Sequence, residues 1–413
     1  MKDNPFLSDT FKNIWSKHFN KDKPLFTFKI LSELSFIKPS CLPIYLNIGV
    51  NHTKGISYIL NENGNEDFKN KVFLIYDVPT YFDLDLKNDY KKLKLKKLKQ
   101  YPGFLVELAE YKDFNHYFFS TFSKSTRYKL SKYKKRLESC FDVSYKMYSG
   151  EIDKDNYDTI FEHFKVLLEK RFLDKGISNN NLNPKEWNFY YEVAYPLILE
   201  NKASLFVIYN GNQPIGITLN YLYKNILIDA ITVFDIDFEK FHLGSVTIMK
   251  LIEWTLDQKI EIFDFSKGYF DYKKRWSNKE YDFEYHLYYD SGSLMAKFNA
   301  YCILNYFNLK NYLRTKNINE VFHKFTFLLK RNKNKANSNI IFEYEAIEKS
   351  YHDSQLEEIN YLDEKNSHLR NMVFDFLYLN TETQKDVTLF QITTEPLSFL
   401  ISGKKTKRKV VIK

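Results

Sequence analysis

Residues 263–276, FDFSKGYFDYKKRW, place reactive side chains at the end of an apolar run. Asp264 stands between two phenylalanines, Gly268 follows, and the stretch ends in a cluster of aromatic and cationic residues that includes Tyr272, Lys273 and Trp276. Open α/β sheets bind ligands beyond the carboxyl ends of their strands, so these residues are candidates for acid–base chemistry or for holding a substrate. The alternative is structural: Asp264 caps the loop, Tyr272 and Trp276 belong to the core, and Lys273 is exposed.

Glycine is scarce, with 12 among 413 residues, so each one marks a position where the backbone needs it. Gly268 would let the chain turn sharply after the apolar run. Gly244 and Ser245 follow one strand-like run and open the apolar helix pattern SVTIMKLIEWTLDQ. The first turn of a helix offers free N–H groups and the positive end of the helix dipole to a phosphate. Ser245 as a simple helix cap explains the same residues without a ligand.

Two further residues stand out from their surroundings. Asp229 lies inside the apolar run ILIDAITVF, and a lone acid in such a strand is either partnered or catalytic. His242 lies near the Gly244 turn, where a lone histidine is more often structural than reactive.

Several reaction classes leave no trace in the sequence. The motifs HExxH, paired CxxC, GxGxxG, GxxxxGK and GxSxG do not occur. Cys41, Cys140 and Cys302 are far apart, which suits neither a metal site nor a closed disulfide framework, so we expect reduced structural thiols. Metal, NAD and covalent-serine chemistry are therefore disfavoured, and no metal is expected.

Charge and hydropathy indicate which partners and which cellular compartment to expect. Lys and Arg number 61 against 52 Asp and Glu, a net charge of +9 with a pI near 8.9. Such a surface suits anionic partners, although the whole chain is rich in Lys, Asn, Ile, Tyr and Phe, and bias alone explains the charge equally well. The start, MKDNPFLSDT, is polar and no run reaches about 18 apolar residues, so we expect neither a signal peptide nor a transmembrane span, and a cytoplasmic protein.

The elements that position these residues predict an α/β fold. The spacing of apolar residues predicts helices over 155–171, 184–200 and 245–258. β-rich runs predict strands over 203–223, 225–234, 260–266 and 281–290. A turn at Asn210-Gly211-Asn212 divides the first of these runs into two strands. A polar loop is expected over 235–244. This order favours one mixed sheet flanked by helices.

The first part of the chain echoes that order. Runs 42–50, 55–60 and 71–78 predict three strands, the Lys/Leu-rich stretch near 85–100 a helix, and 104–110 another strand. Two related halves are therefore expected. Between them, 115–139 has apolar residues on one helical stripe and seven cations over the rest of its surface: Lys124, Arg127, Lys129, Lys132, Lys134, Lys135 and Arg136.

The pattern changes beyond residue 294. Residues 295–331 read as helical, 332–339 as a polar linker, the last ~75 residues as a small appended α/β module, and 403–413 as a basic tail. The expected domains are an N-terminal half over 1–145, a second half over 146–293, and a helical segment, linker and module over 294–413.

Residues 119–276 resemble the BioF2-like, or CelD-type, branch of the GNAT N-acyltransferases. The resemblance runs from FFSTFSKSTRYKLSKYKKRL through LLEKRFLDKG and the strand trio to LGSVTIMKLIEW and FDFSKGYFDYKKRW. The opening NPFLSDTFKNIW also looks like the start of such proteins, and Fem-type aminoacyl transferases share the two-half layout and a terminal Tyr/Phe-Lys motif. The resemblance covers about residues 1–290 and does not extend to the C-terminal part. It implies a GNAT-like mixed central sheet in two GNAT-like halves, each flanked by helices.

The resemblance also implies a site. Acetyl-CoA or another acyl-CoA would be held by the turn before the second half's apolar helix and by the end of the preceding strand, at Val233, Leu243, Gly244, Ser245 and Val246. Family members usually carry Gln/Arg-x-x-Gly-x-Gly/Ala at this turn, whereas EKFHLGSV keeps a single glycine. Backbone N–H groups at 232–234 would polarise the thioester carbonyl where this strand splays from the next.

The catalytic set implied in this way is Lys273, Tyr272, Asp264 and Asp229. Lys273 would present a cation to the acceptor or to developing negative charge, and Tyr272 would support it or protonate the departing thiolate. Arg127, Lys129 and Arg171 match cationic positions of the family and would bind substrate. For each the alternative is a solvated charge or, for Arg171, an ion pair with an acid.

Three functions follow as hypotheses. The first is an acyl-CoA-dependent N-acyltransferase in which an amine attacks the thioester directly. The second is a Fem-like transferase that carries an aminoacyl group from tRNA to a cell-wall or envelope precursor. The third is a non-catalytic binding module with a degenerate GNAT fold. The partner would be an amine-bearing small molecule, a sugar or an envelope precursor, and tRNA in the second case.

Overall fold

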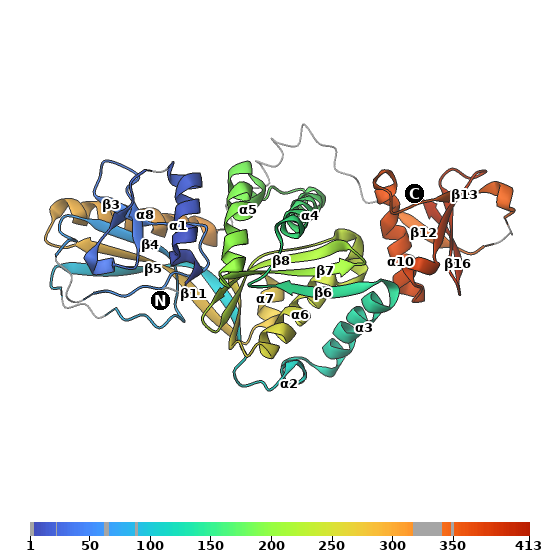
Figure 1. Cartoon of the computed structure of the whole chain (residues 1–413), viewed down its shortest axis with the longest axis horizontal. Helices are drawn as coiled ribbons and strands as arrows, with labels where there is room; N and C mark the ends of the chain where they lie inside the picture. Colours follow the sequence, from blue (N-terminus) through green and yellow to red (C-terminus); the bar gives the residue numbers. More distant parts are fainter. Residues whose placement is uncertain (1–3, 22, 62–65, 87–89, 317–340, 348–350) are drawn as a thin grey trace.

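A computed structural model describes residues 4–21, 23–61, 66–86, 90–316, 341–347 and 351–413. Figure 1 shows one long twisted sheet through the first two thirds of the chain and a separate small sheet at the C-terminal end. The predicted mixed α/β sheet flanked by helices, with a C-terminal extension, is confirmed.

The described residues form an 11-stranded sheet in the order β1-β2-β3-β4-β11-β5-β10-β9-β8-β7-β6. One end of the sheet consists of six strands: β1 (Phe26–Thr27), β2 (Ser35–Ile37), β3 (Ile44–Asn47), β4 (Val72–Pro79), β11 (Lys279–Asp290) and β5 (Leu93–Glu107). The other end consists of β10 (Ile262–Lys267), β9 (Ile226–Phe234), β8 (Gln213–Tyr223), β7 (Ala203–Asn210) and β6 (Val143–Tyr148). Strand β11 lies at the end of the second half in sequence but pairs with β4 and β5 of the first, so the two halves share one sheet.

Helices cover both faces of the second half. Along β7 the side chains alternate between two cores, with Leu205 and Val207 in one and Phe206 and Ile208 in the other, as the two-residue period of a strand requires. The first core is covered by α4 (Lys154–Asp174) and α5 (Pro184–Leu199). The second is covered by α2 (Phe114–Thr121), α3 (Lys124–Cys140) and α6 (Leu243–Asp257). A short helix α7 (Asp271–Trp276) follows β10.

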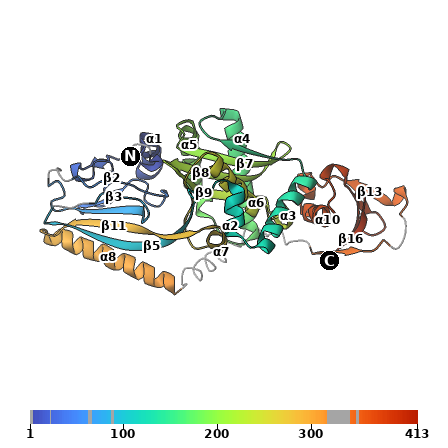
Figure 2. The same ribbon diagram turned by 90° about the horizontal axis from the view of Figure 1, so that it is seen from below.

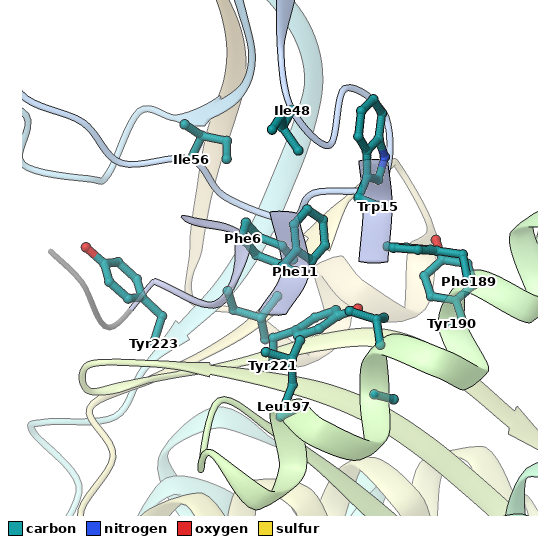
Figure 3. Packing of buried hydrophobic residues seen from close by; sticks show 14 of the residues in the cluster. Phe6, Phe11, Trp15, Ile48, Ile56, Phe189, Tyr190, Leu197, Tyr221 and Tyr223 are labelled. Atoms are coloured by element: carbon teal, nitrogen blue, oxygen red, sulfur yellow. The ribbon is translucent and has the colours of Figure 1, made fainter. Parts of the chain in front are cut away.

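The N-terminal segment joins the two halves (Figure 3). Pro5–Leu7 form a 3₁₀ turn, and α1 (Asp9–Trp15) begins at Ser8, whose hydroxyl accepts from the N–H of Phe11. Phe6 and Phe11 are buried between Ile48 and Ile56 of the first half and Tyr221, Phe189 and Tyr190 of the second. Phe6 contacts Tyr221 edge to face with 4.8 Å between ring centroids. Because these rings belong to one core, the first half is fixed against the helices and strands of the second.

Three predicted elements are wrong. The stretch near 85–100 is not a helix: its described part enters β5, because alternating Leu and Lys side chains pair in register with β11. Residues 55–60 are buried but form no strand. The predicted helix over 115–139 is two helices, since the chain breaks at Phe122 and the Ser123 hydroxyl caps α3 by accepting from the N–H of Thr126 at 3.3 Å. The remaining helices and strands of the second half lie where spacing predicted them.

The C-terminal part begins with α8 (Leu294–Thr315), which confirms the described part of the predicted helical segment. The rest of that segment and the linker at 332–339 lie outside the described residues. The module beyond is a five-stranded antiparallel sheet, in the order β12 (Phe342–Glu345), β16 (Lys407–Ile412), β15 (Ser398–Ser402), β14 (Thr388–Ile392), β13 (Leu356–Ile359), with α10 (Arg370–Asn380) against it.

The basic end of the chain is not a tail. Its strand β16 pairs with both β12 and β15, and Val410 is fully buried. The domain boundaries at 145/146 and 293/294 stay predictions.

Candidate functional site

The sheet opens between two parallel strands of the second half. Strands β9 and β10 pair only from Ile262↔Ile226 to Asp264↔Ile228, and beyond this point β9 continues to Phe234 without a partner on that side. On its other side, β9 carries an irregularity against β8, between Ile231 and Asp229. Alternate N–H groups of a strand point to opposite neighbours, so β9 turns some of its N–H groups from 229 onward into the gap. The predicted splay is present.

A cavity of about 340 Å³ lies in this gap. Five of the predicted site residues line it: Arg171, Asp229, Gly244, Ser245 and Tyr272. They come from α4, β9, α6 and α7, which are distant in sequence. The other lining residues are Thr232, Phe234, Glu239, His242, Thr247, Ile248, Leu251, Arg275 and Trp276.

Two acids line this cavity, Asp229 and the exposed Glu239, and Asp229 is the buried one. Its side chain is 9 % exposed, and the Thr232 hydroxyl donates to Oδ1 at 2.8 Å. Burial raises the pKa of Asp229, and the Thr232 hydrogen bond and the positive charges of Lys273 and Lys54 oppose that rise. A carboxylate whose pKa is raised in this way accepts a proton more readily than an exposed one.

Tyr272 and Arg171 lie close enough to Asp229 to form one electrostatic group. Burial raises the pKa of Tyr272, Asp229 raises it further, and Arg171 lowers it. Tyr272 therefore keeps its proton at neutral pH and can donate it. The Arg171 guanidinium packs over the Phe234 ring at 4.3 Å and donates to the carbonyl oxygen of Thr232 at 3.5 Å. Burial lowers the pKa of Arg171.

The first turn of α6 forms another wall of the cavity. The helix begins after His242, which has φ +50°, and not at Ser245 as the simple-cap alternative required. The N–H groups of Ser245 and Val246 donate to the carbonyl oxygen of His242. The N–H groups of Leu243 and Gly244 precede the first intrahelical donors, so they are available to a ligand. The His242 ring lies 3.9 Å from the Tyr133 ring of α3, a structural contact.

Lys273 and Asp264 do not line the cavity. Lys273 is 5 % exposed, and its Nζ donates to the carbonyl oxygens of Ser266 at 3.3 Å and Lys267 at 3.1 Å. The prediction that Lys273 offers its charge directly to a substrate is therefore not met, and neither is the alternative that it is exposed. Burial lowers the pKa of Lys273, while Asp229 and Asp264 raise it. Its charge reaches the cavity only through Asp229.

Asp264 is a structural carboxylate. The Tyr281 hydroxyl donates to both of its oxygens, at 2.7 and 2.8 Å, and the Tyr81 hydroxyl donates to Oδ2 at 2.9 Å. The Ser266 N–H donates to Oδ1 at 2.7 Å, which is the loop cap that the structural alternative describes. Burial raises the pKa of Asp264 to about 6. Since its acceptor positions are occupied, Asp264 holds β10 against the first half and is not free for catalysis.

The remaining predicted residues lie outside the cavity. Arg127 donates to the carbonyl oxygens of Phe119 and Phe122 and packs over the Phe119 ring, so it closes the turn between α2 and α3. Lys129 is exposed on α3. The side chains of Val233, Leu243 and Val246 are fully buried in the core, so only their backbone can face a ligand. Gly268 has φ +109°, which confirms the predicted sharp turn.

Sequence reasoning missed two features of the site. Arg275 lines the cavity from α7, and its spacing of three from Tyr272 was the available signal. Behind Asp229, a polar cluster joins the two halves: Lys267 pairs with buried Asp77 at 2.6 Å, and Thr53 donates to the same carboxylate at 2.8 Å. Lys54 lies beside them, and burial, with the Lys267 charge, lowers its pKa to about 8. Nothing local marked these residues, because the sheet brings them together.

A larger cavity, of about 550 Å³, lies between the second half and the C-terminal module. Its buried acids Asp235 and Asp237 are both paired with Lys170, at 2.6 and 2.5 Å. Since its charges are neutralised within the protein, the smaller cavity in the open sheet is the candidate active site.

The described residues lack two further features. They contain no group of three or more His, Cys, Asp or Glu side chains that could hold a metal ion. Their helices include none with the length and apolar character needed to cross a bilayer.

Comparisons with known proteins agree with this geometry. A family model described as an acetyltransferase (GNAT) domain matches residues 124–274, from the start of α3 into α7, and these include every residue lining the candidate cavity except Arg275 and Trp276. Among curated proteins no match is found.

A search of solved structures matches a conserved protein of unknown function from Bacteroides thetaiotaomicron VPI-5482, which is 9% identical to this chain. The match covers 69% of this chain and 90% of that one, with a TM-score of 0.42. FemX is 10% identical to this chain. The match covers 61% of this chain and 83% of FemX, with a TM-score of 0.40. L-PGS from Bacillus licheniformis is 12% identical to this chain. The match covers 74% of this chain and 96% of L-PGS, with a TM-score of 0.39. Residues 124–274, which contain the open edge between β9 and β10, therefore match a GNAT acetyltransferase domain.

Proposed function

We propose that the protein is an acyl-CoA-dependent N-acyltransferase of the BioF2-like branch, which moves an acyl group from a thioester to an amine by direct attack. The observation that carries the proposal is the cavity at the β9–β10 opening. It combines a buried acid, a protonated tyrosine, an unpaired strand edge and a helix N-terminus. These are the groups that direct acyl transfer needs.

The donor would enter between β9 and the first turn of α6. The N–H groups of Leu243 and Gly244 would hold its pyrophosphate, and Arg275 would add a positive charge. Gly244 and Ser245 both line the cavity, so the start of α6 borders it, with the Phe234 ring beside Gly244. The thioester supplies an activated acyl group, and the unpaired N–H groups of β9 would stabilise the oxyanion that forms on it.

Two side chains would act as the general base and the general acid. Asp229 takes the proton that the amine loses as its nitrogen bonds to the acyl carbon, and Tyr272 protonates the thiolate as the carbon–sulfur bond breaks. Tyr272 is 40 % exposed, so water can carry the proton from the acid to the phenolate and restore both groups. Lys273 is a positioning residue, which stabilises ionised Asp229 and fixes the loop after β10.

The acceptor would be an amine on a small molecule, a sugar or an envelope precursor, and the reaction would take place in the cytoplasm, where acyl-CoA is made. Lys54 of the first half interacts with Asp229, beside the Asp77–Lys267 pair that joins the halves, so the halves 1–145 and 146–293 would both contribute to acceptor binding.

A thermal-shift titration with acetyl-CoA tests the proposal, with free CoA alongside. A ligand at about 100 times its dissociation constant adds about 2.7 kcal/mol of stability, which gives a visible shift. Arg275→Ala should weaken the shift. Lys274→Ala is the matched control, because Lys274 is an exposed cation of the same helix that does not line the cavity. Absence of any shift at millimolar acetyl-CoA contradicts the proposal.

Aminoacyl-tRNA is the second candidate donor. The observation in its favour is the row of exposed lysines on α3, at Lys124, Lys129 and Lys135. Other cations of α3 already have partners within the protein, including Lys132 and Arg136 over the Tyr378 ring. A complex held by several phosphate contacts loses affinity steeply with salt, so a salt titration with tRNA distinguishes the two donors. If neither donor binds, the non-catalytic hypothesis remains.

A further inference from the structure

Helix α8 has two apolar faces. The inner face packs on the sheet through Ala296, Ala300 and Phe307, whose ring centroid lies 4.1 Å from that of Tyr285 on β11. The outer face carries large apolar side chains that are all more than half exposed: Leu294, Met295, Phe298, Tyr301, Tyr306, Leu309 and Tyr312. We call these seven residues the outer stripe. Figure 2 shows α8 along the outside of β11 and β5, at the surface of the molecule.

The spacing of the outer stripe is that of a helix face. Successive members at 294, 298, 301, 309 and 312 are three, four or eight residues apart. These spacings place them on one side of a helix. An exposed apolar patch of this size on a surface helix is typical of an interaction site. The phenol groups of its three tyrosines remain polar, which suits an interface between an apolar phase and water.

The charged residues of α8 itself are all positive. No Asp or Glu occurs between Asp290 and Glu320, Lys297 and Lys310 are exposed on α8, and Lys316 is exposed directly after it. Strand β5 adds two more cations. Lys94 and Lys96 pair in register with Tyr289 and Leu287, which pack against α8, and residues paired across strands share a face of the sheet.

We infer that α8 lies on the surface of an anionic lipid bilayer, with its outer stripe among the lipid headgroups and acyl chains and its lysines on the headgroup phosphates. An amphipathic surface helix with aromatic and leucine residues on one side and cations beside them is the form that such binding takes. A second copy of the chain fits this face less well. Two outer stripes packed together would bring the lysines of both copies into one interface without an acid to neutralise them.

Flotation of the full chain with vesicles tests the inference. We expect binding to phosphatidylcholine vesicles that contain about 30 % phosphatidylglycerol, weak binding to phosphatidylcholine alone, and release as NaCl rises to about 500 mM. The double variant Phe298→Ser/Leu309→Ser should bind at least about tenfold more weakly. The control variant Leu199→Ser/Leu379→Ser removes exposed leucines from α5 and α10 and should bind as the unsubstituted chain does.

A second pair of variants separates the lysines of α8 from net charge. Lys297→Gln/Lys310→Gln should weaken binding about tenfold, and Lys404→Gln/Lys407→Gln, on the C-terminal module, should not. Equal loss in both pairs, or no binding to anionic vesicles at low salt, overturns the inference. So does a dimer in solution that Phe298→Ser/Leu309→Ser abolishes, which would make the stripe an interface between copies. A fall in melting temperature of the same variant without vesicles would show instead that the chain covers its own stripe.

Discussion

The Phe234 ring lies against the backbone of Gly244, so that a Cβ at position 244 would stand 2.6 Å from Cε1 of Phe234. Arg171 packs on the same ring at 4.3 Å. The end of β9, the start of α6 and a cation of α4 are therefore fitted together at one edge of the candidate cavity. Because a side chain at position 244 would meet the Phe234 ring, packing inside the protein requires the single glycine of this turn.

Gly244→Ala should lower the free energy of unfolding by about 1–3 kcal/mol, because the added methyl group overlaps the Phe234 ring. It should also weaken acetyl-CoA binding, since the ring can yield only towards the cavity or towards Arg171. Urea denaturation and the thermal-shift titration measure both effects. Phe234→Leu in the Gly244→Ala background should recover part of the stability, and additive losses in the double variant would contradict the proposed contact.

Asp229→Asn should reduce turnover by about 10²–10⁴-fold, since the amide cannot accept the proton of the amine. Release of free CoA thiol from acetyl-CoA with a panel of amines measures it. The fold and the affinity for acetyl-CoA should stay near those of the unsubstituted chain, because Thr232 can still donate to the amide oxygen. Full activity of Asp229→Asn would remove Asp229 from the mechanism.

Lys273→Met should move the pH profile of kcat/KM. The positive charge of Lys273 lowers the pKa of Asp229, so its removal raises that pKa, and the loss of activity on the acid side begins at a higher pH. Stability should also fall by about 1–3 kcal/mol, because two buried carbonyl groups lose a donor. Lys273→Arg keeps the charge and should restore the profile more than the stability. An unshifted profile in Lys273→Met would leave the lysine a purely structural role.

Asp264 should make the protein less stable as pH rises. Its pKa is about 6 in the folded protein against 3.8 ordinarily, so the folded state holds the proton more tightly, and stability is lost as pH rises through the folded value. Relative to Asp264→Asn, the unsubstituted chain should lose about 2 kcal/mol of unfolding free energy between about pH 4.5 and pH 7. Urea denaturation of both proteins at the two pH values measures this loss. If both proteins lose the same unfolding free energy, Asp264 is not the group that ionises.

The second half could be predicted from sequence because its signals are local. In α4 the positions Ile160, Phe164 and Leu168 repeat with the helical period, and all three are buried. The turn at Asn210-Gly211-Asn212 separates two β-rich runs, and β7 and β8 meet there. The periods of a helix and a strand are set by backbone geometry, so a regular run of apolar residues fixes the element without reference to the rest of the chain. The resemblance to GNAT N-acyltransferases, together with the predicted positions of these elements, implied Asp229, Gly244 and Tyr272 as site residues.

Tertiary structure decided what each side chain faces. The Leu/Lys run before residue 100 suits a helix or a strand, and its pairing with distant β11 made it a strand. Lys273 and Arg275 are neighbours on the short helix α7, and the burial of Trp276 against Phe122 turns Arg275 to the cavity and Lys273 to the carbonyl groups behind it. Asp264 became structural because Tyr281 of β11 and Tyr81, in the turn after β4, donate to it. Sequence determined the elements and the reactive residue types, whereas contacts between distant segments determined which of those residues remain open to a substrate.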